Sequence, residues 1–263
     1  MKKVILGVMC ILCLFASSQG REKSTKWKAY VPADAYKELT ERSIKTIESL
    51  AKSDDKNAVG KVQVEAAILI GYTLAVDDVK NADVSMLRGA GILASRRAKD
   101  NDVKSLAEFS KQIKGSTVAP ADVMLLKTHQ PTLDDLMELF RNKTKGGEGI
   151  HADLQYSPQL KNLNGIEALI GALAKKKLTE TNADKVAKEL PMLAYRIAVV
   201  GTVTHEMAPE KGAAQWRELA GQMRQSSTAL AEAASKKNAE DIQKAATTLE
   251  DSCTRCHSAF KKK

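Results

Sequence analysis

Three shortages in this chain narrow the functions it can have. Aromatic residues make up 4% of the 263 residues, and the lysines and arginines behind a formal net charge of +9 are spread among acids along predicted helices. No basic patch with interleaved aromatics stands out, so the sequence does not predict nucleic-acid binding, and the charge excess indicates solvated helix faces rather than an acidic partner. No apolar run reaches the roughly 20 residues that span a bilayer. We therefore predict no membrane-spanning helix and no nucleic-acid partner.

Cysteine is scarce as well, and its four copies lie in two places. Cys10 and Cys13 fall within the first 20 residues, whereas Cys253 and Cys256 lie near the C-terminus. A structural zinc site usually takes four ligands in two paired clusters, and no second cysteine pair exists outside the first 20 residues, so zinc is not favoured. A thioredoxin-like dithiol needs a βαβ context, and the surrounding sequence has a helical pattern instead.

The N-terminus has the features of an export signal. Residues 1–20 carry two lysines, then an apolar run from Val4 to Phe15, then small and polar residues. This is the order of regions in a signal peptide. Acylation of Cys10 or Cys13 is disfavoured, because the residues before them are not the small ones expected at such sites. We predict an exported protein, periplasmic or otherwise secreted, that is soluble after loss of residues 1–20.

The rest of the sequence favours helices, because alanine, lysine, leucine and glutamate dominate it. In the second half, apolar residues recur at helical spacing in four segments joined by short turns, as in a four-helix bundle. Pro191 inside the second segment predicts a kink, or a false helix start one turn earlier. Pro209 is well placed as a first helical residue. The four expected helices span 164–176, 183–207, 209–235 and 238–260.

The first half of the chain repeats this plan, with helices expected at 36–52, 57–76, 83–99 and 102–114. Two similar segments, Ile47–Lys52 and Ile170–Lys175, indicate a degenerate duplication, although helical sequences also resemble one another by composition alone. A proline- and glycine-containing stretch with a short helix at 133–141 lies between the halves, and it is either functional or a linker. The expected division is a signal peptide (1–20), a first helical bundle (21–115), a connecting segment (116–162) and a second bundle (163–263).

The most specific feature is the run Cys253-Thr254-Arg255-Cys256-His257, the attachment signature of a covalent c-type haem. Each thiol can close a thioether with one haem vinyl group, and the next residue, His257, can ligate the iron as proximal axial ligand. On a helix the three side chains project toward one face. The first bundle has no cysteine or histidine at the matching position. The sequence therefore predicts one covalent haem c per chain.

The ending of the chain resembles the cytochrome c-prime, or class II cytochrome c, family. In that family, C-x-x-C-H lies in the last helix of a four-helix bundle, with an aromatic and a basic residue after it. Phe260 and Lys261 match these positions and join the motif as expected haem-binding residues. The resemblance covers roughly residues 164–263 and implies an all-α haem bundle, here preceded by a degenerate bundle without haem. The chain departs from the family by this extra half and by a very short connection at Ala208-Pro209.

The resemblance also implies that the first helix of the haem bundle presents an apolar side chain to the distal face of the iron. The expected helix 164–176 holds no Met or His, so Leu169 or Leu173 takes that place. His151, in an irregular stretch, is the main alternative as a distal iron ligand or haem-edge contact, and Met137 is a second. Other candidates, expected to be exposed or in the core, are His129, His205, Met192 and Met207.

Two classes of function follow. The first is an exported c-type cytochrome that transfers electrons, binds a small gas such as NO or CO at an open distal site, or both. The second is a haem enzyme, a small-molecule oxidoreductase that uses the open iron face. Catalysis would favour a distal general acid or base, and the aliphatic wall expected here argues for the first class. The redox partner protein stays unknown, and a homodimer is compatible with the bundle.

Overall fold

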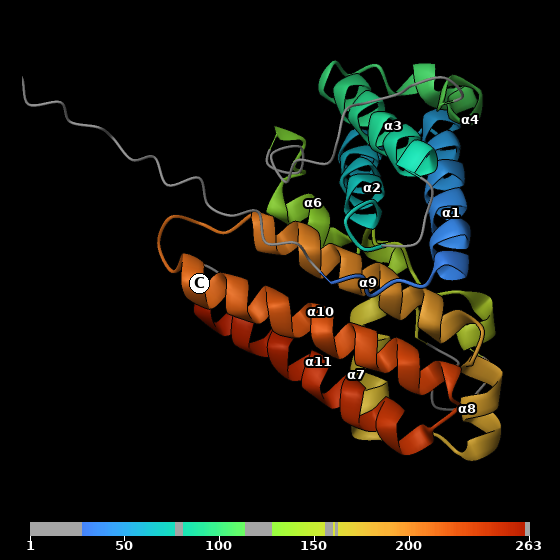
Figure 1. Ribbon diagram of the computed structural model, residues 1–263, viewed down its shortest axis with the longest axis vertical. Coiled ribbons are helices and arrows are strands. Elements are labelled where there is room, and N and C mark those ends of the chain that lie inside the picture. Colours follow the sequence, from blue (N-terminus) through green and yellow to red (C-terminus); the bar gives the residue numbers. More distant parts are fainter. Residues whose placement is uncertain (1–27, 77–80, 114–127, 156–159, 161–162, 261–263) are drawn as a thin grey trace, which may run out of the picture.

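The structure is a computed structural model that describes residues 28–76, 81–113, 128–155, 160 and 163–260. Every regular element in these ranges is a helix and no strand occurs in them, which confirms the all-α prediction. The helices form two groups, one above the other in Figure 1. Within the described ranges, no helix is long and apolar enough to cross a membrane. The expected signal peptide and Lys261 lie outside the described residues.

The first group has three long helices and ends in two short ones. The expected helix 102–114 is instead a 3₁₀ helix followed by one short α-helix. Its buried residues Val103, Leu106 and Phe109 recur every three positions, which is the period of a 3₁₀ helix. The bounds are α1 Ala33–Lys52, α2 Ala58–Tyr72, α3 Asn81–Lys99, η1 Val103–Glu108 and α4 Phe109–Ile113.

The connecting segment folds into short helical pieces. Thr132 caps the first of them, because its side-chain oxygen accepts a hydrogen bond from Asp135 N at 3.1 Å. This helix ends three residues earlier than expected. The pieces are α6 Leu133–Glu138, η2 Lys143–Lys145 and η3 Ala152–Leu154.

The second group is built on four helices. α10 packs against α9 and α11, and α11 packs against α7. The fifth helix, α8, is short and precedes α9. The bounds are α7 Ile166–Lys175, α8 Glu180–Val186, α9 Glu189–Glu206, α10 Ala213–Ser235 and α11 Ala239–Phe260.

Two sequence expectations in this group are wrong. The helix expected at 183–207 is two helices, α8 and α9. Pro191 lies in the first turn of α9, where its missing N–H would have no intrahelical partner. Pro209 does not begin a helix. It lies in a loop, and α10 starts at Ala213 after Gly212, whose φ of 81° is in the left-handed region. The connection between α9 and α10, which the sequence indicated as very short, is therefore a loop over residues 207–212.

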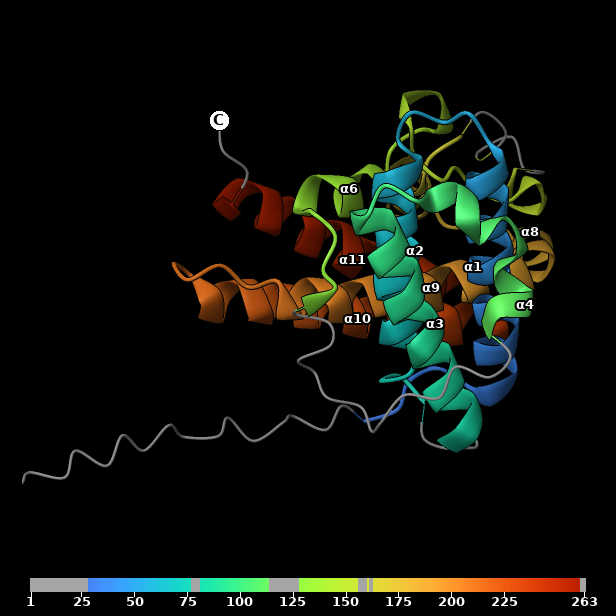
Figure 2. The same cartoon turned by 90° about the horizontal axis from the view of Figure 1, so that it is seen from above.

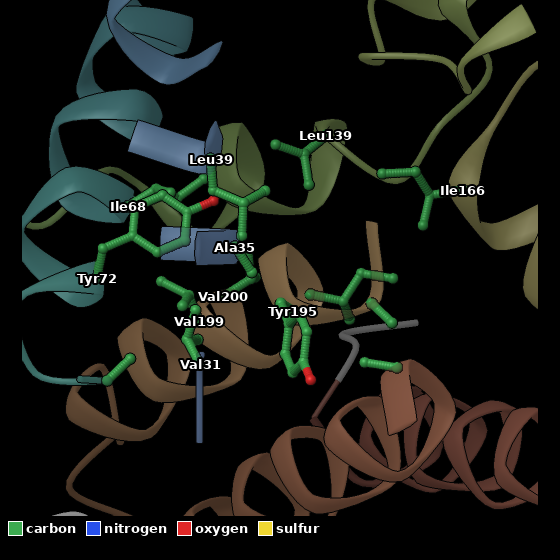
Figure 3. Packing of buried hydrophobic residues seen from close by; sticks show 14 of the residues in the cluster. Val31, Ala35, Leu39, Ile68, Tyr72, Leu139, Ile166, Tyr195, Val199 and Val200 are labelled. Atoms are coloured by element: carbon green, nitrogen blue, oxygen red, sulfur yellow. The ribbon is translucent and has the colours of Figure 1, made fainter. Parts of the chain in front are cut away.

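α9 is shared by the two groups of helices. Its residues are buried on every side, as expected of a helix without a polar face, and it packs against both α10 and α2. Figure 3 shows Val199 and Val200 of α9 close to Ile68 and Tyr72 of α2. The buried apolar residues form one cluster that includes both groups. The core therefore crosses the boundary expected near residue 163.

A buried polar network also joins α9 to the first group. The Arg196 guanidinium hydrogen-bonds the Glu65 carboxylate of α2, and it donates to Glu148 Oε2 at 2.9 Å and to Ser43 Oγ of α1 at 3.2 Å. Arg196 and Glu65 are 6% and 4% exposed. Burial opposes the charged guanidinium, but the two carboxylates outweigh it and hold the pKa of Arg196 above its usual value. Ion pairs and hydrogen bonds of Arg196, as well as apolar packing, therefore join the two groups of helices.

Candidate haem attachment site

The C-x-x-C-H motif occupies the last turns of α11. An apolar stripe at helical spacing buries the earlier part of this helix, ending at Leu249 and Ser252. Cys253 and Cys256 continue the stripe and are half-buried, whereas His257 is exposed. Figure 2 shows these last turns projecting from the body of the molecule, near the start of α10. The motif is therefore held on a regular helix but left open to a planar group.

Aromatic packing fixes the end of α11. The Phe260 ring meets the Trp216 ring of α10 edge-on, with centroids 5.0 Å apart and planes at 79°. Trp216 Nε1 donates a hydrogen bond to the Thr204 carbonyl of α9 at 2.6 Å. Gly212 lies against the same Phe260 ring, where a Cβ would come within 3.0 Å. The residue expected as a haem contact thus packs on α10 and anchors the helix that carries the motif.

His257 lies on the side of α11 that faces α7. Glu250, Cys253 and His257 share one strip at spacings of three and four, and Glu250 Oε1 would lie 3.2 Å from a Cβ built on Gly171 of α7. From Glu250 to His257 the axis of α11 rises about 10 Å, whereas α7 begins about 7.5 Å before Gly171. His257 therefore lies at or past the first residue of α7, beside the N-terminal end of that helix.

The two thiols are neutral side chains rather than activated thiolates. Burial raises the pKa of Cys253 to about 11, and the nearby Cys256, Glu167 and Glu250 act in the same direction. Burial also raises the pKa of Cys256. Reactive cysteines of redox dithiols instead have lowered pKa values. This pair is free in the structure and fits thioether formation with vinyl groups better than dithiol chemistry.

The expected distal residues Leu169 and Leu173 are buried on the core side of α7. α7 meets α11 through Gly171 and through the Ala174 carbonyl, which accepts a hydrogen bond from Gln243 at 3.2 Å. At about 100° per residue, Leu169 points about 160° away from Gly171. Both leucines are 1% exposed, in the core shared with the first group. Their place on the distal side of the iron therefore stays a prediction.

His151 lies far from the motif as well. It caps η3 and places Nδ1 3.6 Å from Asp153 Oδ2 and 3.9 Å from Glu189 Oε2. Glu189 begins α9, whereas Thr204, near the motif, is about 22 Å further along that helix. The two ends of α9 therefore separate His151 from His257. The expectation of His151 as distal ligand fails, because the connecting segment packs at the opposite end.

The other sequence candidates are mostly engaged elsewhere. His129 is buried and lies 3.0 Å from Ser95 Oγ, and His205 Nδ1 lies 2.9 Å from Glu206 Oε1. Met192 lines a different pocket, beside His151. Met137 of α6 and Met207 at the end of α9 are half-buried against the core.

A hollow that the sequence did not indicate lies at the N-terminal end of α7. It has a volume of about 520 Å³. Glu167, which lines it, also acts on the pKa of Cys253, so the hollow opens beside the motif. Polar side chains dominate this hollow, and Leu169 and Leu173 are not among its lining residues. The lining residues are Phe140, Arg141, Asn142, Lys145, Glu167 and Ala168.

Only the glycine-containing run after α6 could have drawn attention to these residues. Nothing in their spacing connects them to a motif more than 80 residues later. They meet it because α6 and the turn after it fold onto α7, with Glu167 N donating to the Phe140 carbonyl at 3.1 Å.

Comparisons with known proteins support this assignment. Residues 211–261 match the cytochrome C' family, and the match spans α10, α11 and the whole C-x-x-C-H motif. The resemblance stated from the sequence is confirmed for this C-terminal part, which is similar to c-type cytochrome haem proteins. No curated protein and no solved structure matches the chain.

Proposed function

We propose that this protein is an exported c-type cytochrome that carries one covalent haem on α11 and acts in electron transfer, small-gas binding, or both. One observation carries the proposal. Cys253, Cys256 and His257 sit on a regular helix, with both thiols neutral and half-buried and the imidazole exposed beside the N-terminal end of α7. These are the three side chains that covalent haem attachment needs, in one place.

The chain would supply attachment, ligation and orientation, while the haem would supply one-electron and gas-binding chemistry. Cys253 and Cys256 form the thioethers in this proposal, and His257 binds the iron. The Phe260–Trp216 contact keeps the last turn of α11 helical, so the imidazole keeps its position relative to the thiols. Export fits the same proposal, because covalent haem capture follows export and residues 1–20 have the pattern of a signal peptide.

The distal side of the iron is proposed to be open. Of the histidines and methionines considered from the sequence, His151 is remote and His129 is hydrogen-bonded to Ser95. Leu169 and Leu173 are buried in the core and stay the proposed aliphatic wall on the distal side. We expect a largely five-coordinate reduced iron that binds CO. Met137 and Met207, at the motif end, are the side chains whose coordination would contradict this.

A haem enzyme is the second candidate, and one observation favours it. Glu167 provides an exposed carboxylate at the rim of the hollow beside Cys253, and a carboxylate near a haem can act as a general acid or base. The family match points to a haem protein that is generally not an enzyme, so electron transfer or gas binding is the function favoured here.

Covalent attachment is the test of the proposal. The full chain, produced in a host that matures c-type cytochromes, is denatured and extracted with acidified acetone. The wild type should keep its pigment at one haem per chain by pyridine haemochrome assay, with the matching mass increase. Cys253→Ala/Cys256→Ala should lose the pigment to the solvent. Pigment that extracts freely from the wild type, or a ratio near two, would contradict the proposal.

The visible spectrum of the reduced wild type, with and without CO, then tests the open distal side. A low-spin spectrum that does not respond to CO would overturn that part alone. Loss of the low-spin spectrum in Met137→Ala or Met207→Ala would identify the ligand.

A further inference from the structure

The hollow beside the motif has a fixed shape because its backbone is tightly packed. Gly146 has a φ of 91°, which favours glycine. A Cβ on Gly147 would come within 1.9 Å of the Arg141 carbonyl oxygen, and one on Gly165 would come 2.9 Å from the carbonyl carbon of the same residue. Side chains at these glycines would displace the turn. The turn between α6 and α7 therefore fixes the backbone of Arg141, whose side chain is exposed.

Two cations line this hollow without partners. Among the described residues, no hydrogen bond or ion pair is recorded for the side chains of Arg141 or Lys145. The one carboxylate in the lining, Glu167, lies toward α11, since its charge acts on the pKa of Cys253. Elsewhere in the described chain, Arg42, Arg97 and Arg196 are all paired with carboxylates. The lining thus carries two cations against one carboxylate, which leaves an excess of positive charge at the hollow.

The geometry of a haem suits this distribution of charge. Its two vinyl groups, which would be bonded to Cys253 and Cys256, lie on one edge of the macrocycle, and its two carboxylates project from the opposite edge. A haem attached to α11 beside the start of α7 would extend over the rim of the hollow, with its carboxylates away from α11. Guanidinium and ammonium groups bind carboxylates by charge-assisted hydrogen bonds. The Phe140 ring in the lining adds an apolar surface for the macrocycle.

We propose that Arg141 and Lys145 bind the haem carboxylates, so that a segment outside the family match completes the haem site. This inference rests on the proposed function. It gives the connecting segment a role, since the sequence alone left open whether that segment is functional or a linker. The turn after α6 would then position the haem edge opposite the thioethers.

The test is the midpoint potential of the holoprotein and its dependence on pH. Arg141→Gln and Lys145→Gln should each lower the potential, because a lost cation favours the more positive ferric state. Each should also move the pH-dependent part of the potential to higher pH, since a haem carboxylate without its cation holds its proton more tightly. The double variant should lower the potential further than either one alone. Arg141→Lys should keep most of the wild-type potential, because the charge remains.

Lys143→Gln is the matched control. Lys143 lies in the same turn, is exposed and does not line the hollow. If Arg141→Gln and Lys145→Gln shift the potential and its pH dependence no more than Lys143→Gln does, in protein with a covalent haem, this inference is overturned and the proposed function stands. If the wild type holds no covalent haem, both are overturned.

Discussion

The two ends of α9 carry two histidines in opposite situations. At its N-terminal end, His151 lies beside the charged pair of Glu189 and Arg42. Glu189 is 3% exposed and accepts hydrogen bonds from Arg42 at 2.8 and 3.2 Å. Near its C-terminal end lies His257, on the same strip as Cys253; both histidines are exposed, so they differ in their partners and not in their exposure. For His257, no hydrogen bond or ion pair is recorded in the described part of the chain. A histidine among satisfied charges has a structural role, whereas one left open beside two thiols is available to a cofactor.

The His151 cluster shows why nearby ligand-type side chains do not suffice for a metal site. His151, Asp153 and Glu189 offer ligand atoms within 4.8 Å of one another. The Arg42 guanidinium, however, already occupies both oxygens of Glu189. Burial acts to raise the pKa of Glu189, but the hydrogen bonds and charge of Arg42 outweigh it and hold the pKa below its usual value. The carboxylate is therefore ionised and compensated without a cation.

The largest difference between the two histidines should appear in the spectrum. His257→Ala should abolish the normal axial ligation, because it removes the ligand beside the attachment site. The product should be either an altered ferrous spectrum or apoprotein. His151→Ala should leave the ferrous spectrum and the haem content at wild-type values. An unchanged spectrum in His257→Ala would require a different proximal ligand, and a changed one in His151→Ala would restore the rejected assignment.

The next largest effect concerns the network that joins α9 to α1 and α2. Arg196→Met should lower the free energy of unfolding by about 3–5 kcal/mol, because it leaves the buried Glu65 carboxylate without its cation. Urea denaturation measures this. Arg97→Met is the control, since Arg97 pairs with Asp102 at the surface, both being more than 40% exposed, and should cost less than about 1 kcal/mol. Equal losses in the two variants would show that the network contributes little to joining the groups.

The smallest effect is pH-dependent and lies at the His151 end. The lowered pKa of Glu189 contributes stability that is present above its unfolded value, about 4.3. That stability is lost as pH falls through the lower native value. Glu189→Gln should therefore cost about 1 kcal/mol at neutral pH, discounted for the partial exposure of Arg42. The cost should vanish in strong acid.

Urea denaturation at several pH values measures this difference. Glu38→Gln removes the exposed partner of Arg42 and serves as control, with a smaller loss at neutral pH. A loss in Glu189→Gln that stays the same from neutral to acid pH would show that packing, and not charge, is involved.

Much of the fold could be predicted from the sequence, because helical periodicity is a local property. The all-α class and most helix positions followed from apolar spacing. The errors have local causes that periodicity does not register, such as the three-residue spacing of Val103, Leu106 and Phe109 and the position of Pro191 in a first turn. The attachment motif was equally local, since its five residues are adjacent.

The haem surroundings could not be predicted in the same way. Leu169 and Leu173 were assigned from a resemblance that gives the position of a helix but not the side it presents. His151 was assigned from its irregular, glycine-containing context, which does not say where a connecting segment packs. Both assignments depend on contacts between residues far apart in the chain, and for that reason the one for His151 failed.

The sequence by itself determined the helical class and the adjacent Cys253, Cys256 and His257, because helix periodicity and thioether spacing act over a few residues. Tertiary structure alone decided that α9 belongs to both groups of helices, that Arg196 joins them through Glu65, and that His151 is far from the motif. It also decided that Arg141 and Lys145 line one hollow with Glu167 of α7. The physical reason is that these arrangements arise from how the buried sides of separate helices fit together, and no short stretch of sequence records that fit.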